Sequence, residues 1–561
     1  MASALAHPGL IVIVAGLLLA LLRGHARSIV ALGAPLAALA LVLSAPEGVL
    51  WRAEYLGLDI VPYAVDRLSR LFATVFAIMV FGGALFALGQ KSRLELPAAY
   101  VYAGSAIGAT LAGDLVTLFV FWELMAIGST LVIWSAGTSR AWAASRRYLA
   151  VHLLGGVLLL AGVAGHVSAT DSTLFTQFAL DTPAHWLILA GFLVNAGAPP
   201  LSAWLPDAYP EASWSGTVFL SAFTTKTAVY VLLRGFPGAE ILVWVGLFMV
   251  FYGIVYALLE NDMRRILAYS IVNQVGFMVT GIGIGTEVAL NGAAAHAFTH
   301  ILYKALLLMS AGSVLYATGR RKCTDLGGLF RTMPLTAVCG GIGALAISSF
   351  PLTSGFVSKS MIAQAAVDQH LLWVYLALAA ASAGVFLHAG IKFPWFVFFQ
   401  RDSGLRPPEP PLNMRLAMLL FAALCVGLGV LYGPLYARLP YPVDYVPYTG
   451  AHVVVQLELL LFSGLAFFVM LPMLRRTLTI TLDTDWLYRR LAPRLVHGLD
   501  RLLAMARAAS RSFAHLLLSR LGAALHRHHG ADGILARTWT TGGMALWVAI
   551  LLAAYLVLYY A

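Results

Sequence analysis

Apolar runs of about 20 residues recur along almost the whole chain and are separated by short polar stretches. A run of this length crosses the hydrocarbon core of a bilayer as an α-helix, because a helix satisfies its own backbone hydrogen bonds there. The pattern therefore predicts an all-α polytopic membrane protein with about 16 transmembrane helices. The predicted helices lie near residues 8–23, 28–45, 68–89, 97–113, 115–136, 147–167, 185–199, 213–234, 239–259, 266–286, 288–316, 333–368, 372–398, 413–435, 453–474 and 541–560.

The same pattern divides the chain into five predicted segments. They are N-terminal membrane helices at 1–95, a central core at 96–400, further membrane helices at 401–475, a basic amphipathic segment at 476–540 and an anchoring transmembrane helix at 541–561. The hydrophobic start at Gly9–Leu22 has no basic region before it, and two arginines follow it. We therefore expect a retained membrane helix there and not a cleaved signal peptide.

The tail differs in kind from the rest of the chain. Residues 475–540 contain 11 arginines and no lysine. From Trp486 to Leu525 the apolar residues recur at helical spacing, which predicts a long amphipathic helix that lies on the membrane surface or on partner subunits. Its apolar stripe consists of Leu495, Leu499, Leu502, Ala506, Ala509, Phe513, Leu517 and Leu521, against Arg494, Arg501, Arg507 and Arg511.

Basic residues are distributed unevenly between the loops. Loops after odd-numbered predicted helices contain clusters such as Arg264 with Arg265, whereas the long stretch 168–184 contains none. Because cytoplasmic loops are enriched in Lys and Arg, this alternation predicts that both termini lie outside a bacterial-type inner membrane. It also places the lateral helix of the tail on the cytoplasmic side. The net charge of +11 fits basic loops beside anionic lipid, so we expect no nucleic acid partner.

The composition narrows the function classes further. Hydrophobic residues make up 60% of the chain and charged residues 11%, whereas a soluble domain carries about 25% charged residues. Cys323, Cys339 and Cys425 are isolated and suggest neither a metal site nor a disulfide framework. No phosphate-binding loop, dinucleotide-binding turn or haem motif is present. We therefore expect no cofactor, no metal and no catalytic centre in this chain, with energy from an ion gradient or from partner subunits.

Lysine usage is the most informative chemical feature. The chain has six lysines and 30 arginines, and two of the lysines, Lys91 and Lys322, lie in loops. The other four lie within apolar segments: Lys226, Lys304, Lys359 and Lys392. A charged group at bilayer depth costs at least about 2.5–3.5 kcal/mol on insertion scales. A lysine can lose its proton when burial disfavours its charge, whereas an arginine stays charged, so the pattern indicates groups that carry protons.

Two of these lysines stand out by position. Lys226 lies in the middle of its segment, too deep for its ammonium to reach the interface easily. Lys304 follows His296 and His300 at spacings of four, so all three side chains share one helix face. One buried histidine is more often a hydrogen-bonded core residue, but this triple indicates an ion pathway.

Two predicted helices are interrupted. Ala198-Pro199-Pro200 ends one of them, and residues 349–355 break another just before Lys359. Proline blocks the helical hydrogen-bond ladder, and broken backbone at membrane depth survives only where protein or water satisfies it. Such breaks are found at ion sites and also as plain kinks. Lys359 is therefore a candidate pathway residue.

The remaining candidates are fewer. Glu123 lies inside an apolar run, where a carboxylate needs either a partner or a proton, and it is a strong pathway candidate. Asp114 lies near a helix end and either caps that helix or belongs to the pathway. Lys392 can extend towards the interface, and His388 precedes it by one turn, so both are possible members of the pathway.

Six motifs occur in a characteristic order. They are Phe121-Trp122-Glu123-Leu124, Trp204-Leu205-Pro206-Asp207-Ala208, Thr225-Lys226-Thr227, Arg265-Ile266-Leu267-Ala268-Tyr269-Ser270, the His296/His300/Lys304 helix and Gly355-Phe356-Val357-Ser358-Lys359. Over roughly residues 60–400 this set resembles the antiporter-like subunits shared by respiratory complex I, membrane-bound hydrogenases and Mrp-type cation/proton antiporters. The Lys226 segment is most similar to the D-type subunit of Mrp systems and to its hydrogenase relatives.

The resemblance implies two inverted five-helix repeats, each with a broken helix, and a hydrated line of charged residues across the middle of the membrane. It implies that Glu123 is the paired glutamate and Lys226 the central lysine. Lys304 with its histidines is then the bridging group, and Lys359 is the terminal lysine. The tail resembles the lateral helix and anchor of the largest antiporter-like subunit of complex I.

One position departs from the family pattern. The family usually has a lysine nine residues before the Trp of the Trp-Leu-Pro-Asp motif, and this chain has Asn195 there. Asparagine carries no charge, so the usual Glu–Lys switch is absent. Either Glu123 pairs with Lys226 instead, or the first half-channel is altered, which makes Asn195 a further possible pathway residue.

These observations predict an ion-translocating subunit of a multisubunit membrane complex that moves protons, sodium or both, with a role like that of the D-type subunit of Mrp antiporters. Its expected partners are other membrane subunits and the lipid bilayer. Three alternatives stay open: a pumping subunit of a complex I-like or hydrogenase-like redox complex, a membrane subunit of an inorganic-carbon uptake system, and a structural subunit with an inactive channel. Asn195 favours the last slightly, and the four retained lysines oppose it.

Overall fold

Helices account for nearly all of the chain. The computed structural model describes residues 6–472 and 483–561. The long helices before the tail are α1 (Pro8–Leu21), α2 (Gly24–Ser44), α3 (Arg67–Phe86), α4 (Glu95–Leu111), α5 (Leu115–Trp134), α6 (Ser139–Thr170), α7 (Pro183–Ala196), α10 (Thr224–Gly235), α11 (Ile241–Leu259), α12 (Met263–Ile284), α13 (Glu287–Thr318), α14 (Pro334–Ile347), α15 (Ser354–Asp368), α16 (Leu372–Val385), α17 (Leu412–Val430) and α19 (Gly450–Val469). Shorter helical pieces are η2 (Ala87–Gly89), α8 (Trp204–Ala208), η3 (Tyr209–Glu211), α9 (Gly216–Leu220), η4 (Cys323–Asp325), η5 (Leu329–Arg331), η6 (Phe386–Lys392), η7 (Trp395–Phe399) and α18 (Gly433–Tyr436).

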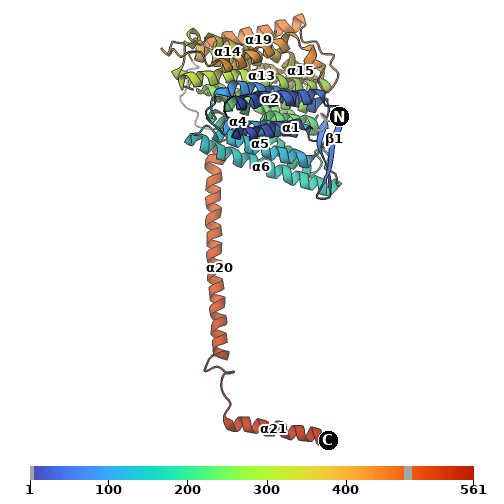
Figure 1. Ribbon diagram of the computed structural model, residues 1–561, viewed down its shortest axis with the longest axis vertical. Helices are drawn as coiled ribbons and strands as arrows, with labels where there is room; N and C mark the ends of the chain where they lie inside the picture. Colours follow the sequence, from blue (N-terminus) through green and yellow to red (C-terminus); the bar gives the residue numbers. More distant parts are fainter. Residues whose placement is uncertain (1–5, 473–482) are drawn as a thin grey trace. The chain divides into compact units, whose positions relative to one another are not determined.

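The chain forms two compact units, Met1–Asp485 and Trp486–Ala561. In the first unit the helices lie side by side with roughly parallel axes, as Figure 1 shows for α1, α2, α4, α5 and α6. The prediction of a helical membrane protein is confirmed, and each predicted segment before the tail falls on one or more of these helices. Twelve helices of the described chain are long and apolar enough to cross a membrane, and α1, α7 and α14 are shorter apolar helices.

Several finer predictions stay predictions. They are the total of about 16 crossings, the two inverted repeats and the division into five segments. Residues 473–482, which include the end of the predicted helix 453–474 and the start of the predicted tail segment, lie outside the described residues.

The two predicted interruptions are present. Helix α7 ends at Ala196, and Gly197 follows in the left-handed conformation that terminates a helix. Helix α14 ends at Ile347, and α15 starts only at Ser354. A third interruption was not predicted: α9 ends at Leu220 and α10 begins at Thr224, two residues before Lys226.

One element is not helical. Strands β1 (Gly48–Tyr55) and β2 (Leu58–Val65) form an antiparallel hairpin between α2 and α3. The turn at Leu56-Gly57 has positive φ at both residues, as a two-residue hairpin turn requires. The membrane-helix pattern gave no indication of this hairpin, because its strands are short and only partly buried.

The core lies around two helices, α12 and α13. Every residue of α13 from Ala289 to Val314 is buried, and α12 is buried over nearly its whole length. Helix α13 packs against α12, α14, α15 and α17. Because α13 also contains His296, His300 and Lys304, these polar groups lie at the centre of the first unit.

The second unit consists of helical tail elements: η8 (Leu487–Leu491), α20 (Ala492–His529) and α21 (Thr541–Tyr560). The predicted long helix from Trp486 to Leu525 is therefore helical over nearly its full length. None of the residues in these three elements is buried. The apolar stripe of α20 is thus available to contact lipid or another protein.

Candidate ion-translocation site

Lys226 lies at the third interruption. Its side chain is fully buried, and its Nζ donates to the Ser221 carbonyl oxygen at 2.7 Å and to Thr225 Oγ1 at 3.0 Å. The interruption between α9 and α10 thus presents a backbone carbonyl that holds the ammonium. This is the use of broken helices that ion sites in membrane proteins require.

The structure places His296, His300 and Lys304 on one face of α13, as predicted, and all three side chains are fully buried. Lys304 Nζ donates to Ser270 Oγ on α12 at 2.8 Å. Neither ring nitrogen of His300 has a hydrogen-bond partner within the described chain. His300 lies one helical turn before Lys304 on α13, so the two side chains share one face of that helix.

His296 connects this group towards α15. Its Nε2 lies 3.1 Å from Gln274 Oε1 on α12, and its Nδ1 lies 3.1 Å from Ser358 Oγ on α15. Ser358 immediately precedes Lys359. Gln274 was not singled out from the sequence, because a lone glutamine in an apolar helix carries no charge signal.

Lys359 borders a cavity of about 580 Å³. Its Nζ lies 4.4 Å from the centre of the Phe277 ring, and among the residues that the structure describes it makes no hydrogen bond. Polar side chains that line the same cavity include Ser360, Gln364, Thr449, His452, Gln456 and Glu458. The lysine at this end of α15 therefore faces a space that water can fill.

Glu458 is a second membrane carboxylate that the sequence reasoning missed. It lies near the middle of α19 and is exposed on this chain. The signal was present in the sequence, because a carboxylate within the apolar run of α19 carries the same cost as Glu123 does.

Glu123 lies on α5 against a glycine of α6. Its Oε1 is buried without a hydrogen-bond partner, and a Cβ atom on Gly156 would collide with that oxygen. The suggested pairing of Glu123 with Lys226 is not present: no ion pair of Glu123 is found across residues 6–472 and 483–561. The Lys226 ammonium instead donates to Ser221 and Thr225.

Asn195 is fully buried near the end of α7 and is paired with a histidine. Its Oδ1 lies 2.7 Å from Nδ1 of His152 on α6. Sequence reasoning missed His152, although Tyr148 precedes it by four residues and Gly156 follows it by four, all on one helix face. That face of α6 contacts both Glu123 and Asn195.

Three possible pathway residues have structural contacts. Asp114 caps α5 by accepting from the amides of Val116 and Thr117, and it also accepts from Val61 of β2 at 2.9 Å. Lys392 Nζ donates to three backbone carbonyls at the end of α11, at 2.5–3.0 Å. His388 Nδ1 lies 2.8 Å from the Gly384 carbonyl oxygen one turn earlier.

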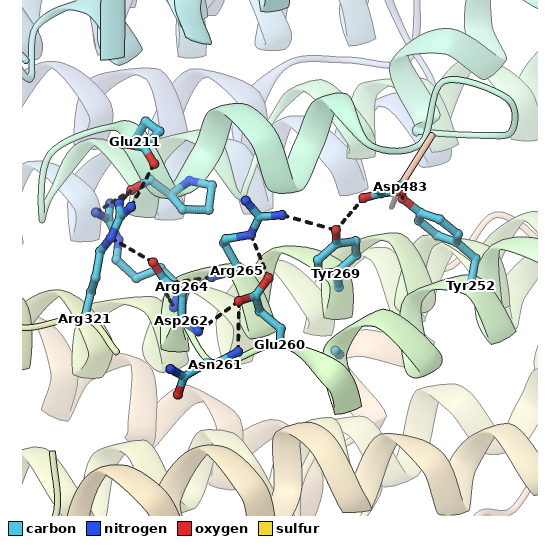
Figure 2. A network of polar contacts seen from close by, with 12 residues as sticks. Glu211, Tyr252, Glu260, Asn261, Asp262, Arg264, Arg265, Tyr269, Arg321 and Asp483 are labelled. Carbon is cyan, nitrogen blue, oxygen red and sulfur yellow. Dashed lines mark hydrogen bonds and ion pairs between the residues drawn. The ribbon is translucent and has the colours of Figure 1, made fainter. Parts of the chain in front are cut away.

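A polar network joins the segments that lead into α12. The guanidinium of Arg264 donates to the carbonyls of Pro210 and Ala212, and Arg321 forms ion pairs with Asp262 and Glu211. Figure 2 shows these contacts around the start of α12. They bind the start of α12 to the segments that contain Pro210 and Arg321.

The same network reaches the end of the first unit. Tyr252 on α11 and Tyr269 on α12 both donate to the carboxylate of Asp483, at 2.7 and 2.5 Å. Arg265 forms an ion pair with Glu260 at 2.8 Å. Figure 2 shows Arg265 between Glu260 and Tyr269, so it joins this part of the network to Asp483. Asp483 is therefore attached to the helix that contains Ser270, the partner of Lys304.

The fold and the site together define the class of membrane protein to which this chain belongs. This is a multi-pass membrane protein in which glutamate, lysine and histidine side chains are held inside the membrane helices, a placement that marks ion pathways. The chain belongs to the NADH:quinone oxidoreductase/Mrp antiporter transmembrane family, whose pattern matches residues 112–384. The resemblance seen in the sequence motifs is thereby confirmed.

Curated relatives from several bacteria are similar over more than half of this chain. The chain is 31% identical over 355 residues to the D subunit of the Na(+)/H(+) antiporter of Alkalihalophilus pseudofirmus, covering 58% of this chain and 72% of the relative. It is 30% identical over 354 residues to the N subunit of the NADH-quinone oxidoreductase of Desulforudis audaxviator, covering 58% and 70%. It is 32% identical over 355 residues to the A/B subunit of a probable K(+)/H(+) antiporter of Rhizobium meliloti, covering 58% of this chain but only 35% of that relative's length.

Two solved structures share the fold. A chain of the Mrp complex from Dietzia sp. matches with a TM-score of 0.66 and 24% identity, over 77% of this chain and 92% of that chain. A chain of the membrane-bound sulfane sulfur reductase, an archaeal respiratory membrane complex, matches with a TM-score of 0.72 and 23% identity, over 99% of this chain and 100% of that chain. The relatives and structural neighbours are thus subunits of multisubunit membrane complexes.

Proposed function

We propose that this chain is the ion-translocating subunit of a multisubunit complex in a bacterial-type inner membrane. The observation that carries the proposal is the set of ionisable groups held inside one helical unit. They are Glu123, Lys226, His300, Lys304, His296 and Lys359, contributed by α5, α10, α13 and α15. Five of these groups are buried and Glu123 is half-buried. Ionisable groups inside a membrane are costly, so such a set in one unit needs a function.

The contacts support a stepwise movement of protons. His300 lies one helical turn before Lys304 and has no hydrogen-bond partner in the described chain, so its ring nitrogens are open to a proton. His296 links the centre to Ser358, beside Lys359. The cavity at Lys359 then provides an exit that water can occupy.

The chemistry of the line favours protons over sodium. Amines and imidazoles carry protons, whereas a sodium ion prefers oxygen ligands and is repelled by ammonium groups. The names of the relatives mention H(+) together with Na(+) or K(+). If a metal cation is exchanged for protons, we propose that it crosses elsewhere in the complex, in an assembly in which this chain acts like the D-type subunit of Mrp systems.

A second setting is supported by the tail. The sulfane sulfur reductase chain matches 99% of this chain, which includes the tail elements, whereas the Mrp chain matches 77%. The second candidate is therefore a pumping subunit of a redox-driven respiratory complex. Purification of the complex with all its subunits separates the two settings: iron–sulfur partners indicate the second, and only small membrane partners indicate the first.

Proton movement by the intact complex in sealed vesicles tests the pathway in either setting. We expect Glu123→Gln and Lys304→Ala to lower the proton flux per assembled complex roughly tenfold or more, because each removes a proton-carrying group. Lys91→Ala is the matched control, since Lys91 is an exposed residue outside the helices. Unchanged flux in both pathway variants would contradict the proposed function.

A further inference from the structure

Asn195, which stands where the family usually has a lysine, is hydrogen-bonded to the titratable side chain of His152. We propose that His152 is the proton-carrying group of the first half of the pathway and relays protons between Glu123 and Lys226. The inference rests on the proposed function and adds to it a residue on α6. It follows from the contacts on each side of the His152–Asn195 pair.

The pair itself fixes the state of the imidazole. The Oδ1 atom of Asn195 can only accept a hydrogen bond, so the proton of neutral His152 lies on Nδ1, 2.7 Å away. The opposite ring nitrogen, Nε2, is left as an acceptor. It is buried and has no hydrogen-bond partner in the described part of the chain, and the same holds for Asn195 Nδ2.

The unpaired atoms point to a transient ligand. His152 is 1% exposed and Asn195 is 0% exposed, so the open ring nitrogen and amide are shielded from bulk solvent. Buried polar atoms without partners cost free energy and are rare in folded proteins. A ring nitrogen that waits for a proton, with a water molecule to deliver it, accounts for both atoms.

Towards Glu123 the connection runs along one turn of α6. Gly156 follows His152 by four residues, so both lie on the same helix face. Gly156 touches Glu123 Oε1, and its neighbour Gly155 faces Asn195 Oδ1. The two glycines therefore let α5 and α7 approach α6 on either side of His152, which places the glutamate about one helical turn from the imidazole.

Towards Lys226 the connection runs through hydroxyl groups. The ring of Tyr148 lies 4.0 Å from that of His152, and its hydroxyl lies 3.3 Å from Thr224 Oγ1. Thr224 begins α10, and the next residue, Thr225, accepts from the Lys226 ammonium at 3.0 Å. Hydroxyl groups both donate and accept, so Tyr148 and Thr224 can pass a proton, with a water molecule bridging the steps from His152 to Tyr148 and from Thr224 to Thr225.

The test removes the titratable side chain at position 152 and then introduces one at position 195. His152→Gln removes the proton carrier and keeps a side chain that can hydrogen-bond Asn195. We expect it to lower proton flux in the intact complex roughly tenfold or more. The double variant His152→Gln/Asn195→Lys places a new amine at the partner position, and we expect it to recover much of the flux. His166→Gln is the matched control, because His166 lies on the same helix but contacts His185.

Each outcome decides the question. Full flux in His152→Gln would overturn the inference, and so would a loss that Asn195→Lys does not rescue, because a packing role is not restored by moving a charge. Glu123→Gln and Lys304→Ala, measured in parallel, separate this failure from that of the proposed function. If those two variants lose flux and His152→Gln does not, only the role of His152 is wrong.

Discussion

At the scale of single residues, two buried lysines differ in whether their ammonium groups are hydrogen-bonded. Lys359 Nζ makes no hydrogen bond within the described residues, whereas Lys392 Nζ satisfies three backbone carbonyls at the end of α11. Lys359 can therefore lose a proton without breaking a hydrogen bond, whereas deprotonation of Lys392 would disturb the end of α11. The two residues therefore separate transport from stability.

We expect Lys392→Met to destabilise the protein by about 1–3 kcal/mol, because it leaves buried carbonyls without donors. We expect Lys359→Met to leave stability unchanged or raised, because it removes an unpaired buried cation. Thermal unfolding in detergent measures the stability of both variants, and proton flux per assembled complex measures their transport. Lost flux is expected only for Lys359→Met, and the reverse assignment would contradict the proposed roles.

Gly156 gives a second test at this scale. Gly156→Ala introduces a methyl group where Glu123 Oε1 now lies, so the carboxylate has to move or the helices have to separate. Overpacking of this kind costs about 1–3 kcal/mol. We expect reduced proton flux with an assembled complex. Gly341→Ala is the control, because nothing lies within 4 Å of a Cβ atom built there.

The sequence alone predicted the charged candidates but not their uncharged partners. Lys226, Lys304 and Glu123 stand out because a charge in an apolar run is costly wherever the helix lies. The pairing of His152 with Asn195 depends on how α6 packs against α7, and no spacing along the chain encodes that contact. The same holds for Gln274, which meets His296 from another helix.

At the scale of elements, two of the three helix interruptions can be predicted from the sequence and one cannot. The breaks near Pro200 and Pro351 carry prolines, so the sequence predicted them. The break at Ser221-Ala222-Phe223 has neither proline nor glycine, and the bond from Lys226 to the Ser221 carbonyl replaces the lost helical hydrogen bond there. A buried side chain, and not a helix-breaking residue, accounts for this interruption.

The tail helix α20 gives a prediction at this scale. Its apolar stripe is exposed in this chain, and the stripe suits a neighbouring membrane protein of the complex. We expect Leu499→Gln combined with Leu502→Gln to lower the yield of co-purified partner subunits several-fold. His515→Gln, off the stripe, is the matched control. Equal recovery of partners in both variants would show that the stripe does not hold the complex together.

At the scale of the whole molecule, the fold class was predictable because membrane crossing needs long apolar runs. The orientation in the membrane stays a prediction from the arginine distribution. We expect a cysteine at Ser403→Cys to be labelled from the cytoplasmic side and one at Thr176→Cys from the opposite side. Background labelling is low, because Cys323, Cys339 and Cys425 are buried. Labelling of both from the same side would contradict the orientation.

The attachment of Asp483 to α12 has a consequence for Lys304. Tyr269, which donates to Asp483, directly precedes Ser270, which holds the Lys304 ammonium. Asp483 and Lys304 are thus bound to adjacent residues of α12. If Lys304 carries protons as we propose, a neighbouring protein that displaces Asp483 acts on the helix that holds this lysine.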